Sequence, residues 1–180
     1  MKFSTIRNIT ALAALTLFAS SCIQVENVEK TWNGSKADPE LLGTWKGDGD
    51  AICAFVKTEK DYFVTTGTNG LEGCCKSFDA GGSKYVIVAS LKASVLGFDK
   101  QDADGKSGTL LRYEVKGDKL IMYSLDANVV KKAVKASEVK GYIEDDNASI
   151  TELDEATIRW FGKIAKQKEG WSESVYKKVK

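Results

Sequence analysis

The sequence contains no histidine and only one proline, Pro39. Without histidine there is no Ser-His-Asp triad, no Cys-His dyad, no His-ligated zinc or haem, and no histidine general base. The glycine-containing signatures of phosphate loops, dinucleotide-binding turns and nucleophile elbows are also missing. The commonest catalytic designs are therefore excluded, and we expect a protein that is not an enzyme and holds no cofactor and no metal.

A strong charge imbalance is missing as well. The chain carries 26 Lys and Arg against 25 Asp and Glu, for a formal net charge of +1. Proteins that bind nucleic acid through its phosphates usually have a basic excess, so we expect no nucleic-acid partner. Hydrophobic residues make up 43% of the 180 residues, which is typical of a globular protein of about one domain.

The acidic clusters predict solvated turns rather than a site. When the stretch 99–105 is aligned with an EF-hand loop, Lys100 and Leu111 fall at two of the calcium-ligand positions. Neither side chain has an oxygen atom that could bind calcium, so the alignment argues against a calcium site. Two carboxylate pairs fall at expected turns, where Asp is favoured for backbone reasons: Asp48 with Asp50, and Asp145 with Asp146.

Residues 1–21 have the pattern of an export signal. Lys2 and Arg7 form a short basic region, and a mostly apolar stretch follows over residues 9–19. This stretch is too short to span a bilayer, which takes about 20 apolar residues, and it has the length of a signal-peptide core. We expect residues 1–21 to be removed.

The residues that end this signal, Ala19-Ser20-Ser21-Cys22, resemble the lipobox of bacterial lipoproteins. The resemblance implies that Cys22 receives a diacylglyceryl group, becomes the first mature residue and is then N-acylated with a fatty acid such as palmitate. The alternative is an ordinary cleaved signal followed by an incidental cysteine. Because Ile23 rather than Asp follows Cys22, sorting of the enteric type favours the outer membrane. The expected location is thus the cell envelope, with the membrane reached through a lipid anchor.

Residues 22–40 read as the lipidated cysteine and a polar tether, since they contain Asn33-Gly34 and the lone proline and show no sustained period. Removal of residues 1–21 takes away Lys2 and Arg7, which leaves 24 basic and 25 acidic residues and a net charge of −1. Attachment to a membrane would therefore depend on the acyl chains rather than on charge. Residues 41–180 are expected to form the folded domain.

Three further cysteines remain, namely Cys53, Cys74 and Cys75. Disulfides persist in exported proteins, so we expect one bridge, from Cys53 to either Cys74 or Cys75. Free thiols, a reactive redox thiol and a thiolate metal site are the alternatives.

Alternation with a period of two dominates from residue 41 onward. It predicts strands over the ranges 41–47, 51–56, 62–66, 84–91, 111–116 and 119–125, with a glycine-rich loop over 67–83. Helical spacing predicts helices over 127–139 and 151–167, the second capped by Thr151, with a short strand pair between them at 142–143 and 148–150. The last residues, 171–180, read as a polar, basic end.

The motif Gly43-Thr44-Trp45 on the first expected strand is similar to that of the lipocalin and calycin barrels. This resemblance implies a mainly β domain, an antiparallel up-and-down barrel with two accessory helices, in which Trp45 packs over one end. It also implies a basic side chain above Trp45, for which Arg112 and Arg159 are the candidates. The stretch from Leu111 to Phe161 resembles small bacterial lipoproteins of lipocalin-like fold.

A barrel of about eight strands is either packed with side chains or holds one small ligand. We therefore expect noncovalent binding of a small apolar ligand, and the candidate wall residues are Tyr62, Tyr85, Tyr113, Met122 and Tyr123. The same side chains could instead simply fill the core. The alternative function is a protein–protein interaction module of the cell envelope, such as an inhibitor or assembly factor, that binds through a loop near Cys74 and Cys75.

Overall fold

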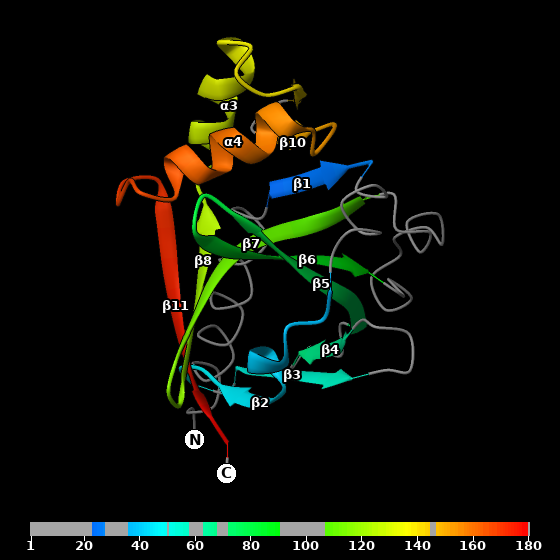
Figure 1. Ribbon diagram of the computed structural model, residues 1–180, viewed down its shortest axis with the longest axis vertical. Coiled ribbons are helices and arrows are strands. Elements are labelled where there is room, and N and C mark those ends of the chain that lie inside the picture. Colours follow the sequence, from blue (N-terminus) through cyan, green and yellow to red (C-terminus); the bar gives the residue numbers. More distant parts are fainter. Residues whose placement is uncertain are drawn as a thin grey trace, which may run out of the picture.

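The computed structural model covers the chain and describes residues 23–27, 36–49, 51–57, 63–67, 72–90, 107–144 and 147–179. This part of the protein is mainly β, with two α-helices, as predicted (Figure 1). The strands are β1 (Ile23–Glu26), β2 (Gly43–Lys46), β3 (Ile52–Lys57), β4 (Phe63–Gly67), β5 (Glu72–Ala80), β6 (Ser83–Ser90), β7 (Ser107–Lys116), β8 (Lys119–Leu125), β9 (Gly141–Glu144), β10 (Asn147–Ile150) and β11 (Trp171–Lys178). The helices are the 3-10 helix η1 (Pro39–Leu41) and the α-helices α3 (Ala127–Lys135) and α4 (Glu155–Ile164).

All eleven strands belong to one sheet in the order β6-β5-β4-β3-β2-β11-β8-β7-β1-β10-β9, and β6 also pairs with β7. The pairs among β2 to β8 and β11 are antiparallel, whereas β1 and β10 run parallel. The sheet continues past β7 through β1 and β10 and ends at β9, so as a whole it is open. The finer prediction, a lipocalin-like up-and-down barrel, is not confirmed by this arrangement.

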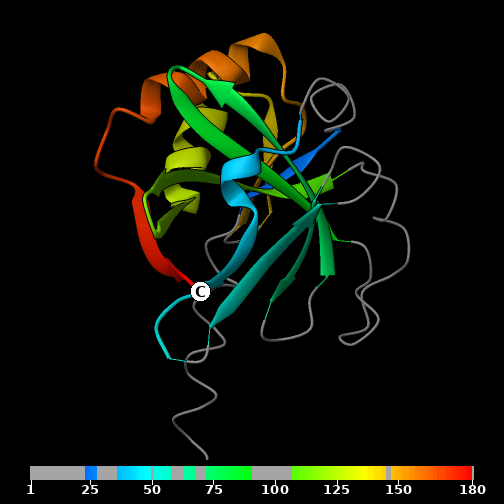
Figure 2. The same cartoon turned by 60° about the horizontal axis from the view of Figure 1, so that its bottom comes forward.

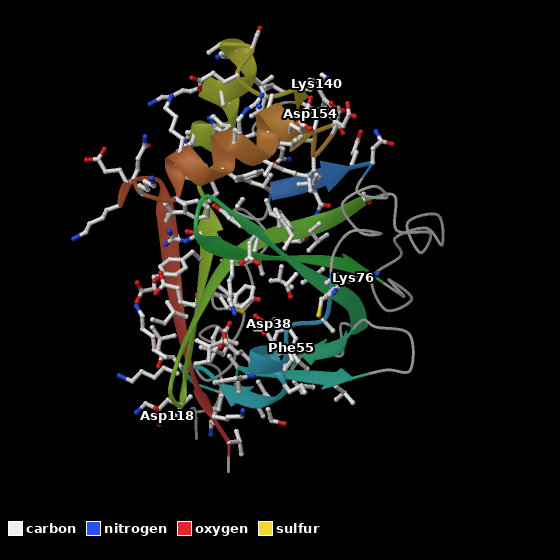
Figure 3. The ribbon with its side chains drawn as sticks, in the orientation of Figure 1. Asp38, Phe55, Lys76, Asp118, Lys140 and Asp154 are labelled. Atoms are coloured by element: carbon white, nitrogen blue, oxygen red, sulfur yellow. The ribbon has the colours of Figure 1, made fainter. Side chains whose placement is uncertain are left out.

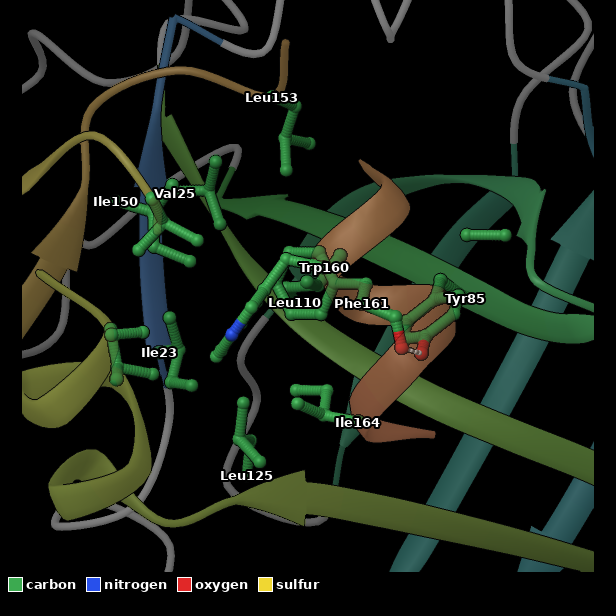
Figure 4. Close-up of a cluster of buried hydrophobic side chains, with 14 of the residues drawn as sticks. Ile23, Val25, Tyr85, Leu110, Leu125, Ile150, Leu153, Trp160, Phe161 and Ile164 are labelled. Carbon is green, nitrogen blue, oxygen red and sulfur yellow. Dashed lines mark hydrogen bonds between the residues drawn. The ribbon is translucent and has the colours of Figure 1, made fainter. Parts of the chain in front are cut away.

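Each face of the sheet carries its own apolar core. The outer cluster lies under the helices and includes Ile23, Val25, Tyr85, Leu110, Leu125, Trp160 and Phe161 (Figure 4). The inner cluster lies on the opposite face and consists of Leu41, Trp45, Phe55, Cys75, Val86, Tyr113, Leu120, Met122 and Tyr176. Adjacent residues in β6 fall in different clusters, Tyr85 in the outer one and Val86 in the inner one, because side chains alternate along a strand.

Both α-helices lie at one end of the molecule, over the outer cluster (Figures 1 and 2). Helix α4 begins at Glu155 and its N-cap is Asp154, whose side chain accepts a 2.9 Å hydrogen bond from the Thr157 amide. The prediction that Thr151 caps this helix was therefore wrong. Asp154 takes the role because a carboxylate placed there pairs with an otherwise unpartnered amide in the first turn.

The clearest predicted hairpin is confirmed in β7 and β8. The turn at Gly117 has a φ of 63°, and Tyr113 lies opposite Met122 across the pair. The short strand pair at β9 and β10 is confirmed as well.

Two segments predicted to be irregular are strands. β5 occupies much of the predicted loop 67–83, and the turn to β6 is made by Gly81 and Gly82, both with positive φ, as a tight hairpin requires. β11 lies within the predicted polar end 171–180 and pairs with β8 from Trp171 to Lys177. These segments form strands because they pair with neighbouring strands, although their own residues are largely polar or glycine-rich.

The predicted tether over 22–40 is also corrected for the residues that the structure describes. Residues 23–26 form β1, in which Ile23 and Val25 are buried. Lys36 forms a β-bridge with Ser77 of β5, and Leu41 at the end of η1 is buried. Burial of these apolar side chains against the domain explains why the segments are ordered.

Candidate functional site

A polar network lies at the margin of the inner cluster, where the segment before η1 meets β6 and β7 (Figure 3). One carboxylate oxygen of Asp38 accepts hydrogen bonds from Lys84 Nζ at 2.7 Å and from the Tyr113 hydroxyl at 2.6 Å. Its other oxygen accepts from the Glu40 amide at 3.0 Å. Lys84 also pairs with the Glu40 carboxylate at 2.7 Å. The network ties residues 38–40 to two strands.

The network sets the protonation of its members. Burial by itself would raise the pKa of Asp38, but hydrogen bonds from Lys84, Tyr113 and the Glu40 amide outweigh it and lower the pKa. The pKa of Lys84 is raised by its hydrogen bonds to Asp38 and Glu40. Burial, followed by the hydrogen bond to Asp38, raises the pKa of Tyr113. At neutral pH, Asp38 is therefore a carboxylate, Lys84 an ammonium group and Tyr113 a neutral donor.

A buried hydroxyl lies next to this network. Ser77 is close enough to influence the pKa of Tyr113, yet its Oγ makes no hydrogen bond of normal geometry to any described residue. A buried polar atom without such a bond costs free energy, about 1–3 kcal/mol. Ser77 Oγ therefore keeps hydrogen-bonding capacity beside the Tyr113 hydroxyl.

Trp45 lies on β2 at one end of the inner cluster and is fully buried. Its indole Nε1 donates to the Leu41 carbonyl at 2.8 Å, and Lys178 Nζ lies 5.0 Å from the ring centroid. The basic residue above Trp45 is thus Lys178 of β11, and the expectation of Arg112 or Arg159 was wrong. Neither arginine is in reach, because Arg112 projects from the other face of β7 and Arg159 lies on α4.

Arg112 instead forms a cluster on the outer face. Its guanidinium lies 3.9 Å from the Tyr123 ring centroid and 4.8 Å from that of Trp171, and Nη1 donates to the Ala165 carbonyl at 2.6 Å. The Trp171 indole donates to the Ile164 carbonyl at 3.2 Å. This cluster therefore joins the end of α4 to β7, β8 and β11.

The structure separates the predicted ligand-wall residues. Tyr113 and Met122 both belong to the inner cluster. Tyr85 is in the outer cluster, where it stacks on Phe78 and donates to the Phe161 carbonyl at 3.0 Å, and burial raises its pKa to about 12. Tyr123 is part of the Arg112 cluster, and Tyr62 lies outside the described residues. Of the four candidates that the structure describes, Tyr113 and Met122 alone are thus brought together.

The strand register bears on the predicted disulfide. Cys53 on β3 lies opposite Gly67 of β4, and Cys75 on β5 lies opposite Phe63 of β4, so that β4 runs between the two strands. Strands two positions apart are about 9.6 Å apart, whereas the Cα atoms of a disulfide are usually about 4.4–6.8 Å apart. Cys74 also lies on β5, and its side chain is outside the described part. The bridge stays a prediction, and this register does not favour it.

Asp38, Lys84 and Ser77 were missed as site residues in the sequence. They are far apart in the chain, since Lys84 lies 46 positions after Asp38. The one local signal is Asp38 before Pro39, a capping residue followed by a proline at the first helical position.

Cys22, the predicted lipidation site, lies outside the described residues. Within the described ranges, no group of three or more Cys, Asp or Glu side chains could hold a metal ion. None of the helices in that part of the chain is long and apolar enough to cross a membrane. Comparison with protein-family models, curated proteins and solved structures found no match to this chain.

Proposed function

We propose that this chain is a noncatalytic, membrane-anchored lipoprotein of the cell envelope, whose β domain is a lipocalin-like barrel that binds a small apolar ligand. Cys22 would carry the lipid, and the outer membrane is the favoured location. The observation that carries the ligand proposal is the inner cluster with polar groups at its margin. Ligand pockets are typically apolar with a few convergent polar groups.

The strand pairings support the barrel part of this proposal. β6 pairs with β5 along one edge and with β7 along the other. Following the pairs from β2 through β8 and then β11 leads back to β2, where Lys177 and Lys178 meet Lys46 and Trp45. Eight strands thus have a neighbour on both sides, which suits a barrel that holds one small ligand.

The polar margin supports an apolar ligand with one polar end. The apolar part would contact Met122 and Phe55, and the polar end would reach Ser77 Oγ or the Tyr113 hydroxyl. Because Asp38 is a carboxylate and Lys84 is bonded to two carboxylates, the margin offers little free positive charge. A neutral donor–acceptor group therefore fits it better than a second carboxylate.

Native mass spectrometry of the protein purified from the envelope tests this proposal. We expect a bound mass that disappears under denaturing conditions and that Met122→Phe reduces, because the added bulk points into the inner cluster. Ile121→Phe, one residue along β8 on the opposite face, is the matched control and should keep the bound mass. A spectrum of the wild type with no bound mass would contradict ligand binding.

A protein–protein interaction module is the second candidate function. The outer face of β3 exposes two aliphatic side chains, Ile52 at 42% and Val56 at 58%. Exposed apolar side chains grouped on one face suit a protein partner. The loop first expected to serve this role, near Cys74 and Cys75, is part of β5. Crosslinking in the envelope from Val56 should capture a partner protein if this function holds, whereas crosslinking from the exposed control position Lys132 on α3, at the other end of the molecule (Figure 1), should not.

A further inference from the structure

The strand β1 is built into the domain on both of its edges (Figure 1). Along one edge it pairs antiparallel with β7, where Ile23 lies opposite Leu110. Along the other it pairs parallel with β10, where Val25 lies opposite Ile150. β1 is therefore an interior strand of the sheet and not an edge strand.

Side-chain packing and hydrogen bonds also hold β1 in place. Ile23 and Val25 are 2% and 0% exposed within the outer cluster (Figure 4). Gln24 donates to Thr109 Oγ1 at 3.3 Å, and the Tyr142 hydroxyl donates to Glu26 at 2.8 Å. At the end of the strand, the Asn27 side chain donates to the Thr151 carbonyl at 2.9 Å. Ile23 itself is thus already part of the packed and hydrogen-bonded strand.

Ile23 is the residue that directly follows the proposed lipid-bearing cysteine, and consecutive Cα atoms are about 3.8 Å apart. We infer that the lipid anchor is joined to the sheet without a flexible spacer, so that the β domain is held against the bilayer surface in one orientation. This inference rests on the proposed lipidation of Cys22. A flexible tether of 19 or so residues would instead allow a reach of roughly 22–26 Å and free rotation.

The position of Ile23 determines which part of the domain faces the bilayer. Ile23 shares the outer cluster with Leu125, which ends β8 just before the first turn of α3 (Figure 4). The opposite end of β8 is the hairpin turn at Asp118, which Figure 3 shows far from the helices. Seven residues of β8 at about 3.3 Å each separate the two ends by about 20 Å. The start of α3 should thus lie near the lipid and Asp118 away from it.

Energy transfer to the bilayer tests this orientation. The acylated mature protein would be reconstituted in vesicles of phosphatidylethanolamine and phosphatidylglycerol that contain an acceptor-labelled lipid. A donor dye would be attached through Asn128→p-azidophenylalanine in the first turn of α3 or Asp118→p-azidophenylalanine at the hairpin, both exposed positions. The matched variant inserts about ten Gly and Ser residues between Cys22 and Ile23, with a mean reach of roughly 17 Å.

We expect more efficient transfer from position 128 than from position 118, and we expect the inserted linker to abolish most of this difference. Equal transfer from both positions in an acylated protein, or a difference that the linker leaves unchanged, would overturn the inference while leaving the lipoprotein proposal intact. An intact mass without acyl groups on Cys22 would overturn the lipoprotein proposal and, with it, this inference.

Discussion

The Tyr113 hydroxyl donates a 2.6 Å hydrogen bond to the Asp38 carboxylate and so joins β7 to the segment that leads into η1. Tyr113 is 1% exposed, and its ring is part of the inner cluster. One side chain therefore contributes both to the apolar core and to the polar network at its margin.

Tyr113→Phe should lower the free energy of unfolding by about 1.5–3 kcal/mol, because it removes a hydrogen bond to a charged acceptor. Urea denaturation followed by tryptophan fluorescence measures this change. Tyr142→Phe is the matched control, since Tyr142 is 42% exposed and its hydroxyl also bonds to a carboxylate, that of Glu26. A loss for Tyr113→Phe no larger than for the control would show that the network does not stabilise the fold.

Asp38→Asn should remove a pH-dependent part of the stability. The pKa of Asp38 in the folded protein lies below its ordinary value of 3.8. Its contribution is therefore complete above about pH 4–5 and is lost as the pH falls through the folded-state pKa. Wild type should be more stable than Asp38→Asn at pH 7, and the denaturation curves of the two should converge as the pH falls below 3.8. A difference that stays constant with pH would contradict the ionised network.

Arg112→Lys should cost about 1–2 kcal/mol, because lysine keeps the charge but loses the planar stacking on Tyr123 and the hydrogen bond to the Ala165 carbonyl. Arg159→Lys is the control: this side chain is 75% exposed, and its contact with Glu155 spans 3.9 Å. We expect its effect to stay within about 0.5 kcal/mol. Thermal unfolding of both variants checks this, and similar melting temperatures would argue against a structural role for Arg112.

Gly81→Ala should be much more damaging than Gly82→Ala. Both glycines have positive φ, 58° and 79°, so alanine is strained at either position. A Cβ at Gly81 would also lie 2.3 Å from the Cα of Gly162 in α4, whereas a Cβ at Gly82 would meet nothing within 4 Å. We expect about 1 kcal/mol for Gly82→Ala and a loss at least about twice as large for Gly81→Ala. Equal losses would mean that the β5–β6 turn does not pack closely on α4.

Strands with a clear alternating pattern of their own were predicted from the sequence, whereas strands stabilised mainly by their neighbours were missed. β7 and β8 were predictable because Leu111, Tyr113 and Val115 alternate with charged residues and Gly117 supplies the turn. β1 was not predictable, because its four residues are too few to show a clear alternation and both neighbouring strands come from much later in the chain. β11 was missed because Tyr176 is its only buried side chain.

The candidate site was less predictable than the fold. Met122 and Tyr113 were predicted as ligand-wall residues, and both lie in the inner cluster. Asp38 and Lys84 could not be, since a pair of charged residues far apart in the chain carries no periodic signal and meets only after η1 and β6 are in place. Tyr85 was placed in the ligand wall because alternation tells which residues share a face, but it does not tell which of two buried faces they share.

The mass of the N-terminal peptide of the mature protein, isolated from membranes, tests the central claim most directly. The account predicts a peptide that begins at Cys22 and carries the added mass of a diacylglyceryl group and a fatty acyl chain. Its Cys22→Ala counterpart should lack both additions and leave the membrane fraction. A mature peptide that begins elsewhere, or an unmodified Cys22 on a protein still bound to membranes, would contradict the account.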